Sequence, residues 1–211
     1  MEKKQYVLRS WYSIVLVISL FLVISCTSKN TARIKIKESG LKQQIAYIEE
    51  QRVTGAKVLD SLYFSGRGVL KYEFKLRQPT FYTIRVPSGK NIYLLVFPGD
   101  RIKVTTEENK PDHLIMEGSS QSQKLTELYD SLFATRKVLD KIRTKYNAST
   151  VQQEKDSLYK DYNKILDGYR HFSMQFVLEN MNSLVSIAAL YQESGENEYV
   201  FGHLRDMQFF I

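Results

Sequence analysis

Apolar and polar residues alternate along the chain between Arg33 and about Gly118, which is the period of a strand with one buried face. Ile, Val, Tyr and Phe, residues that favour strands, occupy the apolar positions. Short clusters of Gly, Pro, Ser and Asp interrupt the alternation and supply turns. The pattern predicts seven or eight short strands, of which the clearest are residues 33–37, 44–48, 57–64, 69–76, 80–86, 92–97 and 101–105.

The two faces of these strands differ in polarity. One face of each strand is apolar and the other carries Lys, Arg and Glu, so we expect one core beneath a solvated outer surface. Many short strands separated by such turns are typical of an antiparallel sandwich or a curled sheet. We therefore expect a β-rich domain over residues 33–118 with an antiparallel β-sandwich-like fold.

Beyond Gly118 the apolar residues recur at the spacing of helices. One apolar stripe runs through residues 125–146 and a second through residues 158–177. Two helices of this length joined by a short polar turn predict an antiparallel helical hairpin. In the turn, Thr150 and Gln153 have the spacing of a capping box that would open the second helix.

A third, shorter helix is expected from Ser183, as its N-cap, to about Gln192. Strands followed by helices place the chain in the α+β class with segregated halves, so residues 119–211 form an α-helical region. The last residues, FGHLRDMQFFI, begin another helical pattern and end on apolar side chains, whereas chain termini are usually exposed. Either a terminal helix is docked there, or the native chain continues beyond Ile211. We expect the second alternative.

The start of the chain has the pattern of an export signal. Residues 11–25 carry no charge, and the preceding residues include Lys3, Lys4 and Arg9. A basic start followed by a short apolar core is typical of a secretory signal peptide. The alternative is a membrane-spanning anchor, but a span needs about 20 apolar residues. We therefore assign residues 1–25 to a signal peptide.

Cys26 is the only cysteine, and it follows the apolar run directly. The stretch from Val23 through Ile24 and Ser25 to Cys26 resembles the lipobox of bacterial lipoproteins. The resemblance implies cleavage between Ser25 and Cys26 and acylation of Cys26, with residues 26–32 as a lipidated tether. Two or three acyl chains, at about 0.8 kcal/mol per buried CH₂, hold a protein stably on a membrane.

The membrane is therefore an expected partner, through the acyl chains on Cys26. No acidic run follows Cys26, so we expect a lipid-anchored protein of the cell envelope, on the outer membrane and facing the periplasm. Residues 31–118 hold fifteen Lys and Arg against ten Asp and Glu, a basic balance that suits either anionic headgroups or an ordinary solvated surface. The bases do not cluster as in nucleic-acid-binding proteins, so we expect no nucleic acid partner.

Catalytic chemistry is not indicated. Thiol–disulfide exchange needs a thiolate and a second sulfur, which a chain with one acylated cysteine lacks. His113, His171 and His203 share no metal-ligand spacing. We expect no catalytic residue, no metal site and no cofactor, and hence a protein that is not itself an enzyme.

Aromatic residues are abundant, with 14 Tyr and 11 Phe. Exposed rings on a sheet can bind sugars or peptides, because they combine a large contact area with a polar tip. The alternation predicts that about half of the strand aromatics point into the core instead. Candidates for an aromatic binding face are Tyr63, Tyr72, Phe81, Tyr82 and Tyr93.

Four stretches together resemble a known family. They are residues 68–82 and 92–104, each a strand–turn–strand unit, the stretch 116–125 and the helical stretch 176–192. The family is the uncharacterised domain that precedes a thioredoxin-like (redoxin) domain in lipoproteins of Bacteroides-type bacteria. In that family a Cys-x-x-Cys pair in the later domain performs the redox work, and this sequence has no such pair. The resemblance therefore implies the role of the front module alone.

Three functions remain open at this point. The first is a non-catalytic, lipid-anchored envelope protein that acts as a spacer, scaffold or recognition module, with an envelope protein as a candidate partner. The second is the N-terminal part of a membrane-anchored thiol–disulfide oxidoreductase whose redox domain lies beyond this chain. The third is a glycan- or peptide-binding lipoprotein. We expect the first.

Overall fold

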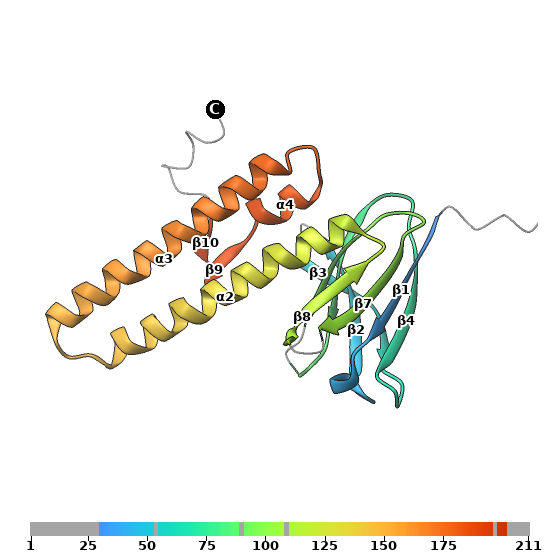
Figure 1. Ribbon diagram of the computed structural model, residues 1–211, viewed down its shortest axis with the longest axis horizontal. Coiled ribbons are helices and arrows are strands. Elements are labelled where there is room, and N and C mark those ends of the chain that lie inside the picture. The colour runs from blue at the N-terminus through green and yellow to red at the C-terminus, as the bar shows by residue number, and fades with distance from the viewer. Residues whose placement is uncertain (1–29, 53–54, 89–90, 108–109, 196–197, 202–211) are drawn as a thin grey trace, which may run out of the picture.

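The computed structural model describes residues 30–52, 55–88, 91–107, 110–195 and 198–201. A sandwich of two sheets comes first in the chain, and a long helical hairpin extends from it (Figure 1). The first sheet has the strand order β4-β1-β7-β8. Its strands are β1 (Thr31–Lys37), β4 (Val69–Lys75), β7 (Arg101–Glu107) and β8 (Lys110–Glu117).

The second sheet has the order β3-β2-β5-β6, and every neighbouring pair in it is antiparallel. Its outer strands are therefore β3 on one side and β6 on the other. The chain also enters a single 3₁₀ turn, η2 (Ser39–Leu41), between β1 and β2. The strands of this sheet are β2 (Ile45–Arg52), β3 (Gly55–Tyr63), β5 (Thr80–Arg85) and β6 (Asn91–Val96).

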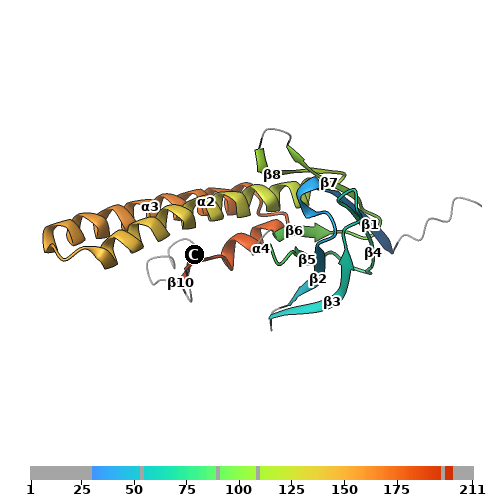
Figure 2. The same cartoon turned by 90° about the horizontal axis from the view of Figure 1, so that it is seen from below.

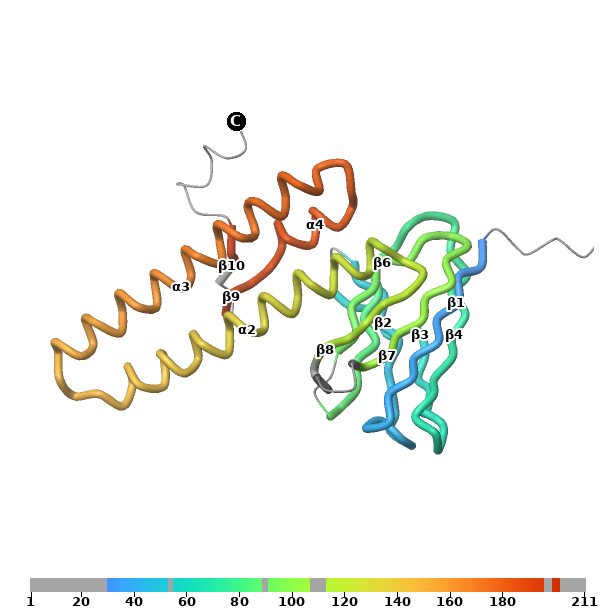
Figure 3. Tube along the Cα trace, in the orientation of Figure 1, coloured from blue at the N-terminus to red at the C-terminus, as the bar shows by residue number. Residues whose placement is uncertain are grey.

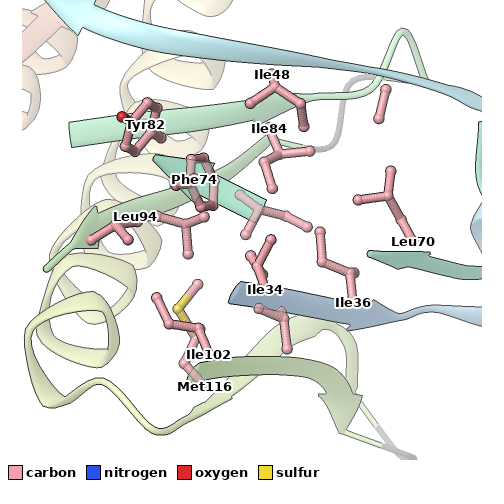
Figure 4. Packing of buried hydrophobic residues seen from close by; sticks show 14 of the residues in the cluster. Ile34, Ile36, Ile48, Leu70, Phe74, Tyr82, Ile84, Leu94, Ile102 and Met116 are labelled. Atoms are coloured by element: carbon pink, nitrogen blue, oxygen red, sulfur yellow. The ribbon is translucent and has the colours of Figure 1, made fainter. Parts of the chain in front are cut away.

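The core of the sandwich is formed by alternate residues of both sheets. Ile34 and Ile36 of β1 face Ile48 and Ile84 of the second sheet, and all four are at most 2% exposed (Figure 4). The residues between them point outward, which gives β1 its alternating burial. Branched aliphatic side chains suit this position, because they pack well on a pleated surface.

The helical part follows β8 directly. Helix α2 (Ser120–Ala148) and helix α3 (Gln152–Glu179) form the hairpin, and the short α4 (Val185–Leu190) folds back beside its base (Figures 1 and 2). A small antiparallel pair, β9 (Glu193–Gly195) and β10 (Glu198–Tyr199), lies beside the hairpin. The trace in Figure 3 shows the turn of the hairpin and the β1–β4 side of the sandwich at opposite ends of the molecule.

The α+β class, the sandwich-like sheets and the helical hairpin are confirmed, and the structure refines the strand list. All seven strands named from the alternation are present, and β8 is the eighth strand. One pairing differs from the antiparallel expectation, because β1 and β7 run parallel. Five strands lie between them in the chain, which is the long connection that a parallel pair needs.

The helix boundaries are less well predicted. The Thr150–Gln153 capping box is wrong, because Val151 is the N-cap of α3 and makes no side-chain cap bond. Ser149 takes the capping role instead: its hydroxyl accepts from the Val151 N–H at 3.2 Å and donates to Glu154 at 2.6 Å. The third helix is shorter than expected, and the β9–β10 pair after it was not predicted.

Two sequence predictions lie outside the described residues. The signal peptide, with Ser25 and the lipidation site Cys26, precedes Asn30, and residues 202–211 follow the last described residue. Among the described residues, no helix combines the length and apolar character needed to cross a membrane.

Gly118 lies between β8 and α2, and a substitution there tests whether its backbone conformation is needed for stability. Its φ is +85°, and a Cβ there would lie 2.1 Å from the Arg101 carbonyl oxygen. We predict that Gly118→Ala lowers the free energy of unfolding by at least about 2 kcal/mol, measured by urea denaturation.

The matched control is Gly66→Ala, since a Cβ at Gly66 meets nothing within 4 Å. This control should change the free energy of unfolding by less than about 1 kcal/mol. Equal effects of the two substitutions would contradict the role given to Gly118.

Candidate functional site

Helix α2 is fixed to the sandwich along strand β6. The side chain of Leu95, on the outer face of β6, is fully buried and packs in one cluster with Leu125 and Leu128 of α2. Phe176 of α3 and Val185 of α4 complete the buried part of this cluster. The next residues along β6, Leu94 and Val96, point into the sandwich core, so β6 is buried on both faces.

A hydrogen-bonded clamp reinforces this contact. Strand β6 is at the edge of its sheet, so the outward N–H and C=O of Leu95 have no strand to bind. The Ser122 hydroxyl of α2 accepts from the Leu95 N–H at 3.1 Å and donates to the Leu95 carbonyl at 3.0 Å. One fully buried hydroxyl therefore satisfies both backbone groups and holds the first turn of α2 against the strand.

Helix α2 also contacts the edge of the other sheet. The Thr126 hydroxyl lies 3.4 Å from the Met116 sulfur of β8. On the same side, His113 Nδ1 lies 3.4 Å from Asp130 Oδ2, and burial raises the pKa of Asp130 above its ordinary value. Because α2 contacts β6 and β8, the outer strands of the two sheets, it closes this side of the sandwich.

Aromatic rings extend the contact along α2. Tyr93 of β6 stacks on Tyr129 with ring centroids 3.7 Å apart, and Phe133 lies beside both rings. Burial raises the pKa of Tyr129 from its ordinary value to about 12, and the neighbouring Tyr93 acts in the same direction. The Tyr93 and Tyr129 rings therefore lie in a largely dry contact that favours the neutral hydroxyl.

The helices at the base of the hairpin are joined to one another by polar contacts. Lys124 of α2 donates to Asn180 after α3 at 2.7 Å, and Arg136 of α2 donates to the Glu193 carbonyl of β9. The Tyr169 hydroxyl of α3 binds Gln192 at 2.5 Å, and burial raises the pKa of Tyr169 to about 12. The hairpin is therefore fixed at its base by α4 and β9 as well as by the sheet.

Three surfaces remain that could bind a partner. The first is the outer face of the first sheet, where an open hollow of about 490 Å³ is lined by residues of β4, β1 and β7 and also reaches Leu62 of β3. Its charged lining, which we call the basic sheet face, consists of Arg33, Lys35, Lys71, Glu73, Arg101 and Lys103.

The second surface is apolar and lies at the end of α3 and along α4. Leu184, Ile187 and Tyr191 have the spacing of one helix face, and all three are exposed. Leu178 and Met181 precede them and are 53% and 69% exposed. We call these five residues the apolar α4 surface.

The third surface is at the turn of the hairpin. A small apolar pocket of about 180 Å³ lies between the ends of α2 and α3 and is lined by Tyr146, Tyr159 and Tyr162 among others. Arg143 donates to the Tyr162 hydroxyl at 3.3 Å. This pocket is smaller than the 300 Å³ or more typical of small-molecule sites.

The five aromatic candidates do not share one exposed face. Tyr82 is 6% exposed in the sandwich core, and Tyr72 packs against Phe74 at the edge of that core. Phe81 and Tyr93 lie on the opposite face of the second sheet, where the helices cover them. Tyr63, at the end of β3, is 71% exposed.

The sequence did not single out Ser122 as a clamp. The signal that could have located its partner strand is the unbroken apolar run of residues 92–97, since a strand that is apolar at every position is buried on both faces. Among the residues described, no group of three or more His, Cys, Asp and Glu side chains is arranged to hold a metal ion.

Comparisons with known proteins identify no family. No protein-family model matches the chain, and a search of curated proteins gives no match. Among solved structures, the NMR structure of a protein from Eubacterium rectale is similar over 46% of this chain and 97% of that chain. The two are 13% identical, and the TM-score is 0.26.

Removing the Ser122 hydroxyl tests the clamp. We predict that Ser122→Ala lowers the free energy of unfolding by about 1 to 3 kcal/mol, because two buried backbone groups of Leu95 lose their partner. The exposed Ser157→Ala in α3 is the control and should change the free energy by less than about 0.5 kcal/mol. A loss no larger than that of the control would show that the clamp contributes nothing to stability.

The buried Tyr129 predicts a loss of stability at high pH. Its folded-state pKa of about 12 is above the unfolded value of about 10, so its contribution is complete below pH 10 and is lost as the pH rises through 12. Tyr129→Phe removes this titrating group. Between pH 10 and 12 the free energy of unfolding should therefore fall by about 2 kcal/mol more in the wild type than in the variant.

Urea denaturation at each pH, with the exposed Tyr63→Phe as control, measures this difference. If Tyr63→Phe and Tyr129→Phe reduce the fall in the free energy of unfolding at high pH equally, burial of Tyr129 is not the cause of that fall.

Proposed function

We propose that this chain is a lipid-anchored protein of the bacterial cell envelope that acts as a spacer and scaffold without chemistry of its own. The observation that carries the proposal is the fixed hairpin: α2 and α3 extend from the sandwich, and the Leu95–Ser122 clamp sets their direction. The 29 residues of α2 correspond to about 43 Å of helix. A fixed arm of this length suits a protein that holds a partner at a set distance.

The position of the tether supports the same role. Strand β1, which begins at Thr31, lies on the side of the sandwich opposite the hairpin turn (Figures 1 and 2). Only four residues lie between Cys26 and Thr31, and even a fully extended chain over these five residue-to-residue steps spans only about 18 Å. Acyl chains on Cys26 would therefore keep the sandwich near the membrane and direct the hairpin away from it.

A second function is favoured by the apolar α4 surface. The residues of this surface are exposed, and a domain that follows in the chain could cover them. The surface therefore suits the front part of a longer thiol–disulfide oxidoreductase, in which this chain would position a redox domain. The resemblance to the module that precedes redoxin domains supports the same alternative.

Intact mass of the protein extracted in detergent from the envelope of its own host separates the two functions. The mass of residues 26–211 plus acyl chains supports the spacer and scaffold. A much larger acylated mass supports the oxidoreductase, and a mass without acyl chains contradicts both.

Energy transfer to the bilayer tests the spacer directly. Once Cys26 is acylated, a cysteine introduced elsewhere is the sole reactive thiol, so one fluorophore can be attached at Asn30→Cys or at Thr150→Cys in the hairpin turn. We predict strong transfer from position 30 to acceptor lipids and weak transfer from position 150. Equal transfer from both positions would contradict a hairpin that projects from the membrane.

A further inference from the structure

The basic sheet face carries an excess of positive charge over the acids that the structure describes on it. Five of its six charged residues are bases, and Lys37 and Lys75 extend the same outer face on β1 and β4. Two acids described on this face, Glu73 and Glu117, pair with Arg33 at 2.7 Å and with Lys103 at 2.9 Å. Within the described residues, neither Lys35 nor Lys71 forms an ion pair.

The register concentrates this charge. Lys35 of β1 lies directly opposite Lys71 of β4 on one side and Lys103 of β7 on the other. Like charges directly opposite each other on a sheet are unfavourable, since their Cβ atoms are about 5 Å apart. In the next row, Arg33 likewise lies beside Arg101. An arrangement of this kind is expected where anionic groups bind and offset the repulsion.

The shape of the basic sheet face indicates what kind of anion it binds. The hollow is open and lies on a sheet, and its charged side chains are exposed, as at Arg33 and Lys103, where about half of the side chain is accessible. The bases are spread over three adjacent strands, a width of about 10 Å. Such a face suits an extended anionic surface with many phosphates better than a single enclosed ligand.

The position of the tether favours one source of such an anionic surface. If Cys26 is acylated, as the proposed function holds, β1 begins within about 18 Å of the membrane, and the bases are on β1 and its two neighbours. We infer that the basic sheet face lies against the anionic phosphate headgroups of the membrane that carries the anchor. This inference rests on the proposed function and adds an orientation to it: the first sheet faces the lipid, and α2 and α3 extend away.

Lysine acetylation of the full chain tests the orientation. The protein extracted in detergent is reconstituted in vesicles of phosphatidylcholine alone or of equal phosphatidylcholine and phosphatidylglycerol, and is treated with an uncharged acetylating reagent. Mass spectrometry of its peptides then gives the rate at each lysine. We expect Lys35 and Lys71 to react at least about fivefold more slowly in the anionic vesicles, whereas Lys145 and Lys160 near the hairpin turn react equally in both.

Charge-reversal variants show whether the face itself makes the contact. In Lys35→Glu/Lys71→Glu, the protection of Lys37 and Lys103 should be lost, whereas the matched pair Lys145→Glu/Lys160→Glu should leave protection unchanged. High salt should also remove the protection, since it screens exposed charges. Circular dichroism of each variant shows that the fold is retained.

Other outcomes overturn the inference. Equal reactivity in neutral and anionic vesicles would show that the face does not contact headgroups. The same protection by inorganic phosphate with neutral vesicles would assign the face to a soluble anion. Intact mass, measured before reconstitution, reports the acylation of Cys26 separately. If the chain is not acylated, it is added in solution to the same vesicles. Slower acetylation of Lys35 and Lys71 with the anionic vesicles still supports the inference, and equal acetylation with both still overturns it.

Discussion

The architecture depends on how one edge strand is covered. Strand β6 would present unpaired backbone groups and an apolar outer face to water, but α2 covers both. Ser122 satisfies the N–H and the carbonyl of Leu95, and Leu125 and Leu128 bury its side chain. Because the same helix also contacts β8, this one contact closes the sandwich on that side and sets the direction of the whole hairpin.

The outer faces of the two sheets differ, because the helices cover the outer face of the second sheet. Helices cover the second sheet along β6 and part of β5, so Phe81 and Tyr93 lie in a largely dry contact. The first sheet keeps a bare outer face, on which the polar positions of the alternating strands are mostly Lys and Arg. A covered apolar face that supports the hairpin and a bare basic face on the first sheet give the molecule two different ends. If Cys26 is acylated as proposed, these two ends would suit a spacer on an anionic membrane.

Much of this fold can be predicted from the sequence, because period alone separates strands from helices. The alternation located the sandwich strands, and the two apolar stripes located α2 and α3. The pattern could not show that β1 pairs in parallel with β7, since pairing depends on contacts between distant segments. The basic sheet face could not be predicted for the same reason. Lys35, Lys71 and Lys103 are far apart in the chain and become neighbours only through the register of the strands.

The measurement that tests the account most directly is the distance between the sandwich and the hairpin turn in solution. Spin labels at Lys57→Cys in β3 and at Thr150→Cys, in a chain with Cys26→Ser, report it by double electron–electron resonance. A hairpin fixed by the Leu95–Ser122 clamp predicts one narrow distance distribution. A broad distribution, with the turn sampling many distances from β3, would contradict the fixed arm on which the account depends.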